Sequence, residues 1–258
     1  MATIVFFHAH PDDEAIGTGG SIARAVAEGH KVCVVTATGG EYGEAPDGVE
    51  GPDALRELRA AETHEACRIL GVSWGHFLGY IDSGMIGSET NDAPGSFWSA
   101  DVDEAAGRLA TVLREQEADV LTIYDDHGGY GHPDHIQVHR VGVRAAELAA
   151  TPAVFEATMD RDHIMSLGPR FAEAGIEGVG EEEFDFSEVG EPASKITTRV
   201  DVRPFLAKKR SAMAAHRSQI SETSFFLALP EEVFDLTWGE EWYIRRGAPA
   251  GTVEHWFF

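Results

Sequence analysis

The sequence predicts an α/β fold in which a Rossmann-like, mostly parallel sheet is flanked by helices. Short apolar runs rich in β-forming residues alternate with amphipathic segments along the first 160 residues. Between residues 3 and 36 this alternation reads strand, helix, strand, which is the spacing of a βαβ unit and therefore of a parallel sheet. With 258 residues the chain is long enough to bury a substantial core.

Each element has a local signal of its own. The run TIVFFH at 3–8 is continuously apolar and predicts a buried strand. Gly71 ends one long amphipathic segment as a helix C-cap, and Asp101 opens another as an N-cap. Pro133 falls in a first helical turn, where it is tolerated. The predicted strands are 3–8, 31–36, 72–78, 119–124 and 153–158, and the predicted helices are 17–30, 53–70, 101–115 and 133–150.

The pattern loosens after residue 160, so we divide the chain into a core of 1–160 and a C-terminal portion of 161–258. We expect the second portion to pack on the core within a single overall domain and to help shape the substrate pocket. A strand at 197–202 and a helix at 205–219 are predicted there. Residues 172–192 are acidic and glycine-rich, which predicts a loop or a small appended element. The C-terminal aromatic residues are expected to pack onto the main body.

Composition limits the partners. The chain has 44 acidic against 20 basic residues, a net charge of −24, and such a surface repels nucleic acid and anionic membranes. The two cysteines lie in buried-type runs and predict reduced thiols. No apolar run approaches the 18 residues of a membrane span, and the first residues lack the pattern of a signal peptide. We therefore expect a cytoplasmic protein, and the sequence leaves a homo-oligomer open.

The loop after the first strand is rich in ionisable side chains. His10, Asp12, Asp13 and Glu14 follow the strand directly, and histidine and aspartate are both transition-metal ligands. The three-residue spacing of His10 and Asp13 suits a turn into a helix where both could face one ion, leaving Asp12 free for another role. Capping of the following helix would explain one aspartate, but it would not explain His10.

A second such loop follows the fourth strand. His132 and His135 bracket Asp134 at a predicted helix start. The carboxyl ends of parallel strands meet at one edge of a sheet, so both loops are expected to form one site. Two histidines and one carboxylate, with a fourth position left for water, are the ligand layout of a catalytic zinc. The same set also suits non-haem Fe²⁺.

Several motifs resemble the LmbE-like, or PIG-L, deacetylase family. They are AHPDDE at 9–14, TATGGE at 36–41, RELRAAE at 56–62, LGV at 70–72, DSGM at 82–85, GGYGHPDH at 128–135 and HRSQ at 216–219. The resemblance spans most of residues 3–220 and is closest to the branch that handles glucosaminyl-inositol and mycothiol substrates. It implies a zinc-dependent enzyme that hydrolyses amide bonds.

The resemblance also implies a role for individual residues. The metal ligands are His10, Asp13 and His135. Asp12 is the general base, His132 supports the transition state or protonates the amine, and Asp134 orients His132. The substrate is contacted by Tyr130, which reaches the oxyanion, and by Arg59 and Asp82, which hold sugar or inositol hydroxyls.

Three functions stay open on the sequence. The first is removal of an N-acyl group, most simply acetyl, from an amino sugar such as N-acetylglucosaminyl-inositol. The second is an amidase acting on mycothiol S-conjugates, and the third is a sugar-binding relative without catalysis. The intact set of His10, Asp12, Asp13, His132 and His135 favours an enzyme. A dinucleotide site is disfavoured because the glycines at 17–20 have the wrong spacing.

Overall fold

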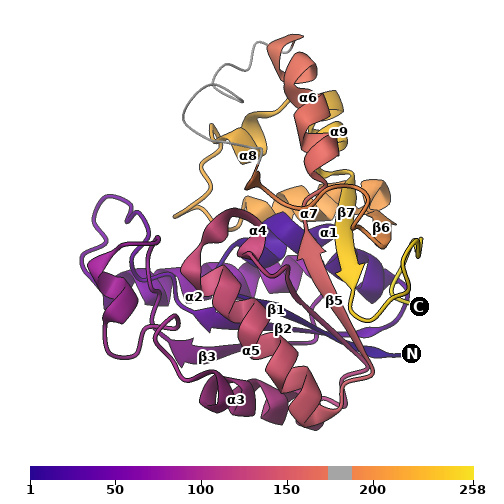
Figure 1. Cartoon of the computed structure of the whole chain (residues 1–258). Helices are drawn as coiled ribbons and strands as arrows, with labels where there is room; N and C mark the ends of the chain where they lie inside the picture. Colours follow the sequence, from indigo (N-terminus) through magenta and orange to yellow (C-terminus); the bar gives the residue numbers. More distant parts are fainter. Residues whose placement is uncertain (174–187) are drawn as a thin grey trace.

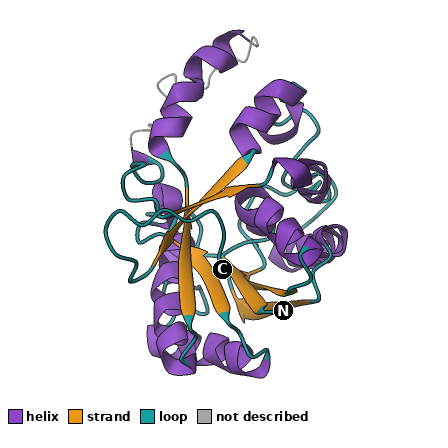
Figure 2. Ribbon diagram, turned by 90° about the vertical axis from the view of Figure 1, so that its right-hand side faces the viewer, coloured by secondary structure: helices purple, strands orange, loops and turns teal. Residues whose placement is uncertain are grey.

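The computed structural model describes residues 1–173 and 188–258. They form one mixed sheet of seven strands with helices on both faces (Figures 1 and 2). The strands are β1 (Thr3–His8), β2 (Lys31–Thr38), β3 (Trp74–Tyr80), β4 (Val120–Tyr124), β5 (Ala153–Thr158), β6 (Thr198–Asp201) and β7 (Glu240–Arg245). The α-helices are α1 (Asp13–Ala27), α2 (Pro52–Leu70), α3 (Val102–Glu115), α4 (Gly128–Gly131), α5 (Pro133–Ala149), α6 (Arg161–Glu173), α7 (Leu206–Met213), α8 (Phe225–Ala228) and α9 (Glu231–Trp238).

The sheet confirms the predicted α/β class. Its strand order is β3-β2-β1-β4-β5-β7-β6, and the first five of these strands are parallel to one another. β1 therefore lies inside the sheet, and its side chains alternate between the two faces. Ile4 and Phe6 join one hydrophobic core, while Val5 and Phe7 join the other. Strands buried on both faces need continuous apolar runs, which is the pattern that identified β1 from the sequence.

Helices cover each face of the sheet. The core on one face contains residues of α1, α2 and α7, and the core on the other contains residues of α3 and α5. The first core also takes in residues from the C-terminal end, including Phe257, which contacts Phe6 and Tyr243. The expected packing of C-terminal aromatics on the main body is thus confirmed for the described residues.

The C-terminal portion extends the core sheet. β7 pairs antiparallel with β5 on one side and with β6 on the other. The sequence predicted β6, but β7 was missed because its apolar run is only three residues long, WYI, and the strand begins two residues after the end of the short helix α9. Helices α6, α8 and α9 lie together at the top of Figure 1. They were also missed: α8 and α9 are only 4 and 8 residues long, and α6 contains Pro169, which interrupts a helical pattern.

Some predicted boundaries were wrong. Helix α1 begins at Asp13 rather than at 17, so two acidic side chains lie in its first turn, where the helix dipole favours them. The helix predicted over 205–219 ends at Met213, and a one-turn helix, α4, lies within the loop expected after the fourth strand. Most of the acidic segment 172–192 lies outside the described residues.

Candidate metal centre and active site

The predicted site residues gather at the carboxyl ends of the parallel strands. The loop after β1 carries His10 and Asp12, and α1 begins at Asp13. The loop after β4 leads through α4 into α5, which carries His135 in its first turn. A third loop, after β3, brings Asp82 to the same place. The loops that follow parallel strands all emerge at one edge of the sheet, and that explains the convergence.

One group of three side chains matches the ligand set implied by the resemblance. The ligand atoms of His10, Asp13 and His135 all lie within 4.8 Å of one another. Oδ2 of Asp13 is 3.5 Å from Nδ1 of His10 and 3.4 Å from Nε2 of His135. Two ligand atoms about 2.0–2.1 Å from a tetrahedral zinc are roughly 3.3–3.4 Å apart, so this spacing fits the ion.

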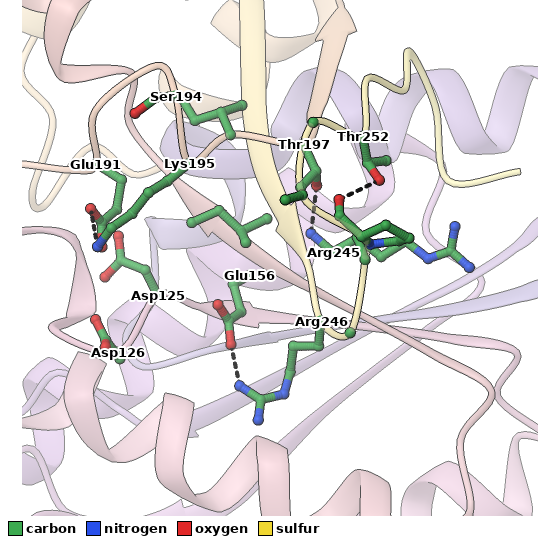
Figure 3. Close-up of a pocket in the computed structure, with 17 residues that line it drawn as sticks. Asp125, Asp126, Glu156, Glu191, Ser194, Lys195, Thr197, Arg245, Arg246 and Thr252 are labelled. Atoms are coloured by element: carbon green, nitrogen blue, oxygen red, sulfur yellow. Dashed lines mark hydrogen bonds and ion pairs between the residues drawn. The ribbon is translucent and has the colours of Figure 1, made fainter.

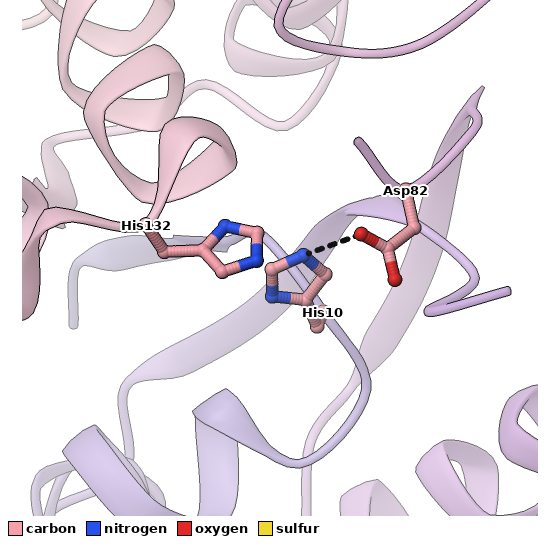
Figure 4. Close-up of side chains that lie close together, drawn as sticks. All are labelled: His10, Asp82 and His132. Atoms are coloured by element: carbon pink, nitrogen blue, oxygen red, sulfur yellow. Dashed lines mark ion pairs between the residues drawn. The ribbon is translucent and has the colours of Figure 1, made fainter. Parts of the chain in front are cut away.

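A second group of three shares His10. It consists of His10, Asp82 and His132, with the ring of His10 lying between the other two side chains (Figure 4). Oδ1 of Asp82 lies 3.5 Å from Nε2 of His10 and also accepts a hydrogen bond from the N–H of Gly84 at 2.8 Å. The two groups use opposite nitrogens of the His10 ring, so the partner of each nitrogen decides which group can hold an ion.

The nitrogen Nε2 of His10 has Asp134 as its partner. Its fully buried carboxylate lies 3.1 Å from Nε2 of His10 and accepts the N–H of Ser83 at 2.9 Å. Metal-binding histidines commonly donate their free ring N–H to such a carboxylate, which orients the ring and fixes its tautomer. In that arrangement Nδ1 of His10 faces Asp13 as a ligand atom, which favours the first group.

Asp134 contacts both His10 and His132. The resemblance implied that Asp134 orients His132, and the backbone N–H of Asp134 does contact that ring, while its carboxylate contacts His10. His132 is held by the backbone N–H of Asp134, which donates to Nδ1 at 3.1 Å. His132 is the N-cap of α5, so its backbone is extended while its ring accepts from the first turn.

Asp12 lies beside the proposed ligands without acting as a side-chain helix cap. It occupies the N-cap position of α1, yet within the described part of the chain its carboxylate makes no capping hydrogen bond. Helix capping therefore does not explain why an aspartate occupies position 12. Burial and the neighbouring charge of Asp13 raise the pKa of Asp12 to about 8. A cation at the adjacent site would oppose this shift, because it stabilises the carboxylate.

The other titratable groups of the site carry shifts of clear origin. Burial lowers the pKa of His10, but the carboxylates of Asp13, Asp134 and Asp82 outweigh burial and raise it well above its usual value. Burial and the nearby charge of His10 lower the pKa of His132 to about 4, so its ring is neutral at pH 7. Burial also raises the pKa of the Tyr130 hydroxyl, which keeps it a hydrogen-bond donor.

Tyr130 and Arg59 border the group from two sides. The hydroxyl of Tyr130 is 3.4 Å from Nε2 of His135, and Tyr130 is 40% exposed at the mouth of the site. Arg59 is buried, contrary to the solvated position usual for an arginine on a helix, and its guanidinium donates to the carbonyls of Gly40 and Glu44. It therefore anchors the loop after β2 close to the charges of Asp12 and Asp82.

Sequence reasoning missed several supporting contacts. The buried ring of Tyr124 stacks on His135 with centroids 4.5 Å apart, and its hydroxyl is 2.8 Å from Nδ1 of His8. Oε1 of Glu14 is 2.6 Å from Nε2 of His216, and the charge of Glu14 outweighs burial and raises the pKa of His216. The signal available for His216 was the HRSQ motif, but no spacing rule links residues 202 positions apart.

A separate polar cavity of about 500 Å³ lies against β5 and β7 (Figure 3). Its charged side chains pair with one another, as in the ion pairs of Arg246 with Glu156 and of Lys195 with Glu191. Asp125, on its wall, accepts hydrogen bonds from the N–H of Gly129 and from a threonine hydroxyl. These carboxylates are engaged within the protein, and Asp125 fixes the loop that leads to Tyr130.

A mostly parallel α/β sheet with His and Asp side chains that could hold a metal at its carboxyl edge, and a further carboxylate beside them, is an arrangement suited to a metal-dependent hydrolase. The family model described as PIG-L, GlcNAc-PI de-N-acetylase, matches residues 5–146. The chain belongs to this family and is an enzyme that hydrolyses amide C–N bonds. The predicted family and enzyme class are thereby confirmed. His216 lies outside the matched range.

Full-length relatives give a consistent picture. A protein of Thermomonospora curvata named 1D-myo-inositol 2-acetamido-2-deoxy-alpha-D-glucopyranoside deacetylase is 43% identical, over 96% of this chain and 91% of its own. A protein of the same name from Streptomyces avermitilis is 41% identical, over 96% of this chain and 95% of its own. The predicted class of N-deacetylase is confirmed by these matches together with the family.

Solved structures share the fold. N,N'-diacetylchitobiose deacetylase of Pyrococcus horikoshii is 21% identical, with a TM-score of 0.59 over 94% of this chain and 83% of its own. The hydratase GalB of Pseudomonas putida is 18% identical, with a TM-score of 0.60 over 96% and 98%. A deacetylase and a hydratase on one architecture show that the reaction depends on the site residues and not on the fold.

None of the described helices is both long and apolar enough to cross a membrane.

Proposed function

We propose that this chain is a zinc-dependent hydrolase that removes the acetyl group from N-acetylglucosaminyl-inositol. The observation that carries the proposal is the convergence of His10, Asp13 and His135 on one point, with Asp12 beside them. The names of the relatives support the sugar and the acetyl group. The assignment of zinc rests on the donor set of two histidine nitrogens and one carboxylate oxygen.

The proposed mechanism assigns one task to each side chain. His10, Asp13 and His135 would hold a zinc ion, which when bound would supply a Lewis acid for the amide carbonyl and would lower the pKa of water to about 7. Asp12 accepts the proton of the attacking water. Asp134 keeps the ring of His10 oriented through its contact with Nε2.

The developing oxyanion and the departing amine need donors. Tyr130 presents a hydroxyl next to His135, and its high pKa keeps the proton in place as a donor. Removing one such donor costs about 10²–10³-fold in turnover in comparable sites. The ring of His132 lies next to that of His10, with centroids 4.6 Å apart, and either His132 or the protonated Asp12 delivers a proton to the amine. Arg59 and Asp82 hold sugar or inositol hydroxyls, as the resemblance implies.

The enzyme acts on a small amino-sugar substrate, and we place it in the cytoplasm. Both cysteines, Cys33 and Cys67, are free thiols in the hydrophobic cores, as expected for a reducing compartment.

The test compares three substrates with zinc-loaded protein and follows release of free amine. N-acetylglucosaminyl-inositol is expected to give the highest kcat/KM, with free N-acetylglucosamine and a mycothiol S-conjugate well below it. A higher kcat/KM on the conjugate would show an amidase instead. No amine from any of the three, with zinc bound, would refute the proposal and would favour a sugar-binding relative without catalysis. Reconstitution with Fe²⁺ in place of Zn²⁺ under anaerobic conditions tests the assignment of the metal.

A further inference from the structure

The backbone of Asp12 has a conformation that residues with side chains rarely adopt. Its φ is 102° and its ψ is −30°, while its carbonyl accepts the N–H groups of Ala15 and Ile16 at 2.9 and 3.0 Å. A residue other than glycine keeps such a conformation only where surrounding contacts hold it in place. Since Asp12 is the base of the proposed reaction, the contacts that hold its backbone bear directly on catalysis.

Glu14 accepts a hydrogen bond from the other backbone group of Asp12, its N–H. Its Oε2 accepts the N–H of Asp12 at 3.1 Å, and its Oε1 is 2.6 Å from Nε2 of His216. The side chains of Glu14 and His216 are both completely buried. With one oxygen on each partner, the carboxylate of Glu14 cannot turn toward one of them without breaking its bond to the other.

The segment that carries His216 is itself tied down. The carbonyl of His216 accepts the N–H groups of Gln219 and Ile220 at 3.0 and 2.7 Å. Ser218 donates its N–H and its hydroxyl to the carboxylate of Glu62 in α2, at 2.9 and 2.6 Å. The C-terminal portion therefore presents the His216 ring to Glu14 from a fixed position.

We propose that His216 and Glu14 are positioning residues that hold the backbone of Asp12 in its left-handed conformation and so aim its carboxylate. Neither is assigned a role by the motif of the metal ligands. This inference rests on the proposed function in one respect, because it concerns the base of that reaction. It also gives the C-terminal portion a specific task at the site.

Two variants of one residue test the proposal. Glutamine in His216→Gln places its amide nitrogen near the position of Nε2 and can still donate to Glu14, whereas the shorter side chain in His216→Asn cannot reach. We expect His216→Gln to keep kcat within about threefold. His216→Asn is expected to lose about 100-fold in kcat with an unchanged KM, the effect of misplacing a catalytic group by about 1 Å. Ser221→Ala, at an exposed position further along the same segment whose hydroxyl lies 3.3 Å from that of Thr223, is the matched control with unchanged kcat.

A second readout does not depend on turnover. The exchange rate of the Asp12 amide proton, measured by NMR on the full chain, is expected to be at least tenfold faster in His216→Asn than in His216→Gln. Zinc affinity, measured by competition with a chelator, should be the same in both, because His216 contacts none of the proposed ligands.

The two kinds of failure can be told apart. If wild-type protein releases no amine from any sugar, the proposed function fails, and the amide exchange still tests the positioning. Equal exchange rates in His216→Asn and His216→Gln would overturn the inference, as would equal kcat values in an active enzyme. A parallel loss of zinc affinity and kcat in His216→Asn would indicate general collapse of the site and would also overturn it.

Discussion

Replacing Asp12 by asparagine should separate proton transfer from the architecture of the site. Asparagine has the same shape as aspartate and is among the residues that tolerate positive φ, so the backbone at 102° is retained. An amide cannot accept the water's proton, and general-base catalysis contributes about 10²–10⁴-fold. We expect kcat of Asp12→Asn to fall by that factor, about 3–5 kcal/mol in the barrier, with zinc still bound.

The same variant should also change the stability of the metal-free protein. Burial and the charge of Asp13 raise the pKa of Asp12 to about 8, so between about pH 4 and pH 8 the folded state holds a proton that the unfolded state releases. The free energy of unfolding of the wild type therefore falls as pH rises through this window, by at most about 1.4 kcal/mol per pH unit. Asp12 is partly exposed, which makes this an upper limit. In Asp12→Asn this carboxylate is absent, so the variant does not show this decrease in the free energy of unfolding with rising pH.

Urea unfolding in the presence of a chelator measures the difference at pH 5 and at pH 7. The stability of Asp12→Asn relative to wild type is expected to increase between the two values. Two results would refute the reasoning. One is turnover within tenfold of wild type, which would exclude Asp12 as the base. The other is a stability difference that does not change with pH, which would show that Asp13 does not disfavour its charge.

Three further predictions concern the metal, a buried ion pair and the thiols. Chelation should abolish amine release, and stoichiometric Zn²⁺ should restore it. Bound zinc should also raise Tm, because an ion that binds only the folded state stabilises it. Full activity in excess chelator would contradict the proposed metal centre. Lys209→Met should lower the free energy of unfolding by about 3–5 kcal/mol, because Lys209 forms an ion pair at 2.7 Å with Glu241 and both side chains are buried. A loss below about 1 kcal/mol, measured by urea unfolding, would show that this ion pair does not stabilise the fold. Cys33 and Cys67 should resist a thiol reagent at pH 8 in the folded state, because burial raises the pKa of both thiols, and both should be labelled once urea unfolds the protein. Fast labelling of either thiol in the folded protein would contradict the structure.

Local sequence signals accounted for the central sheet and for the two loops that end its strands. Strands β1 and β4 are buried on both faces, so they read as continuous apolar runs, and α2 ends at a glycine whose φ is 87°. The dense histidines and aspartates directly after β1 and β4 then indicated a metal site, because the carboxyl ends of parallel strands share one edge. Each of these signals lies within about fifteen residues of chain.

The sequence by itself therefore determined the α/β class, the family and the residues able to bind a metal. Only the tertiary structure decided which of them contact one another. It placed the Asp134 carboxylate on His10 rather than on His132, buried Arg59 against the loop after β2, and set His216 against Glu14. The physical reason is that these contacts join residues 19 to 202 positions apart, and their geometry depends on how separate helices pack on the sheet. No local periodicity or spacing records that packing.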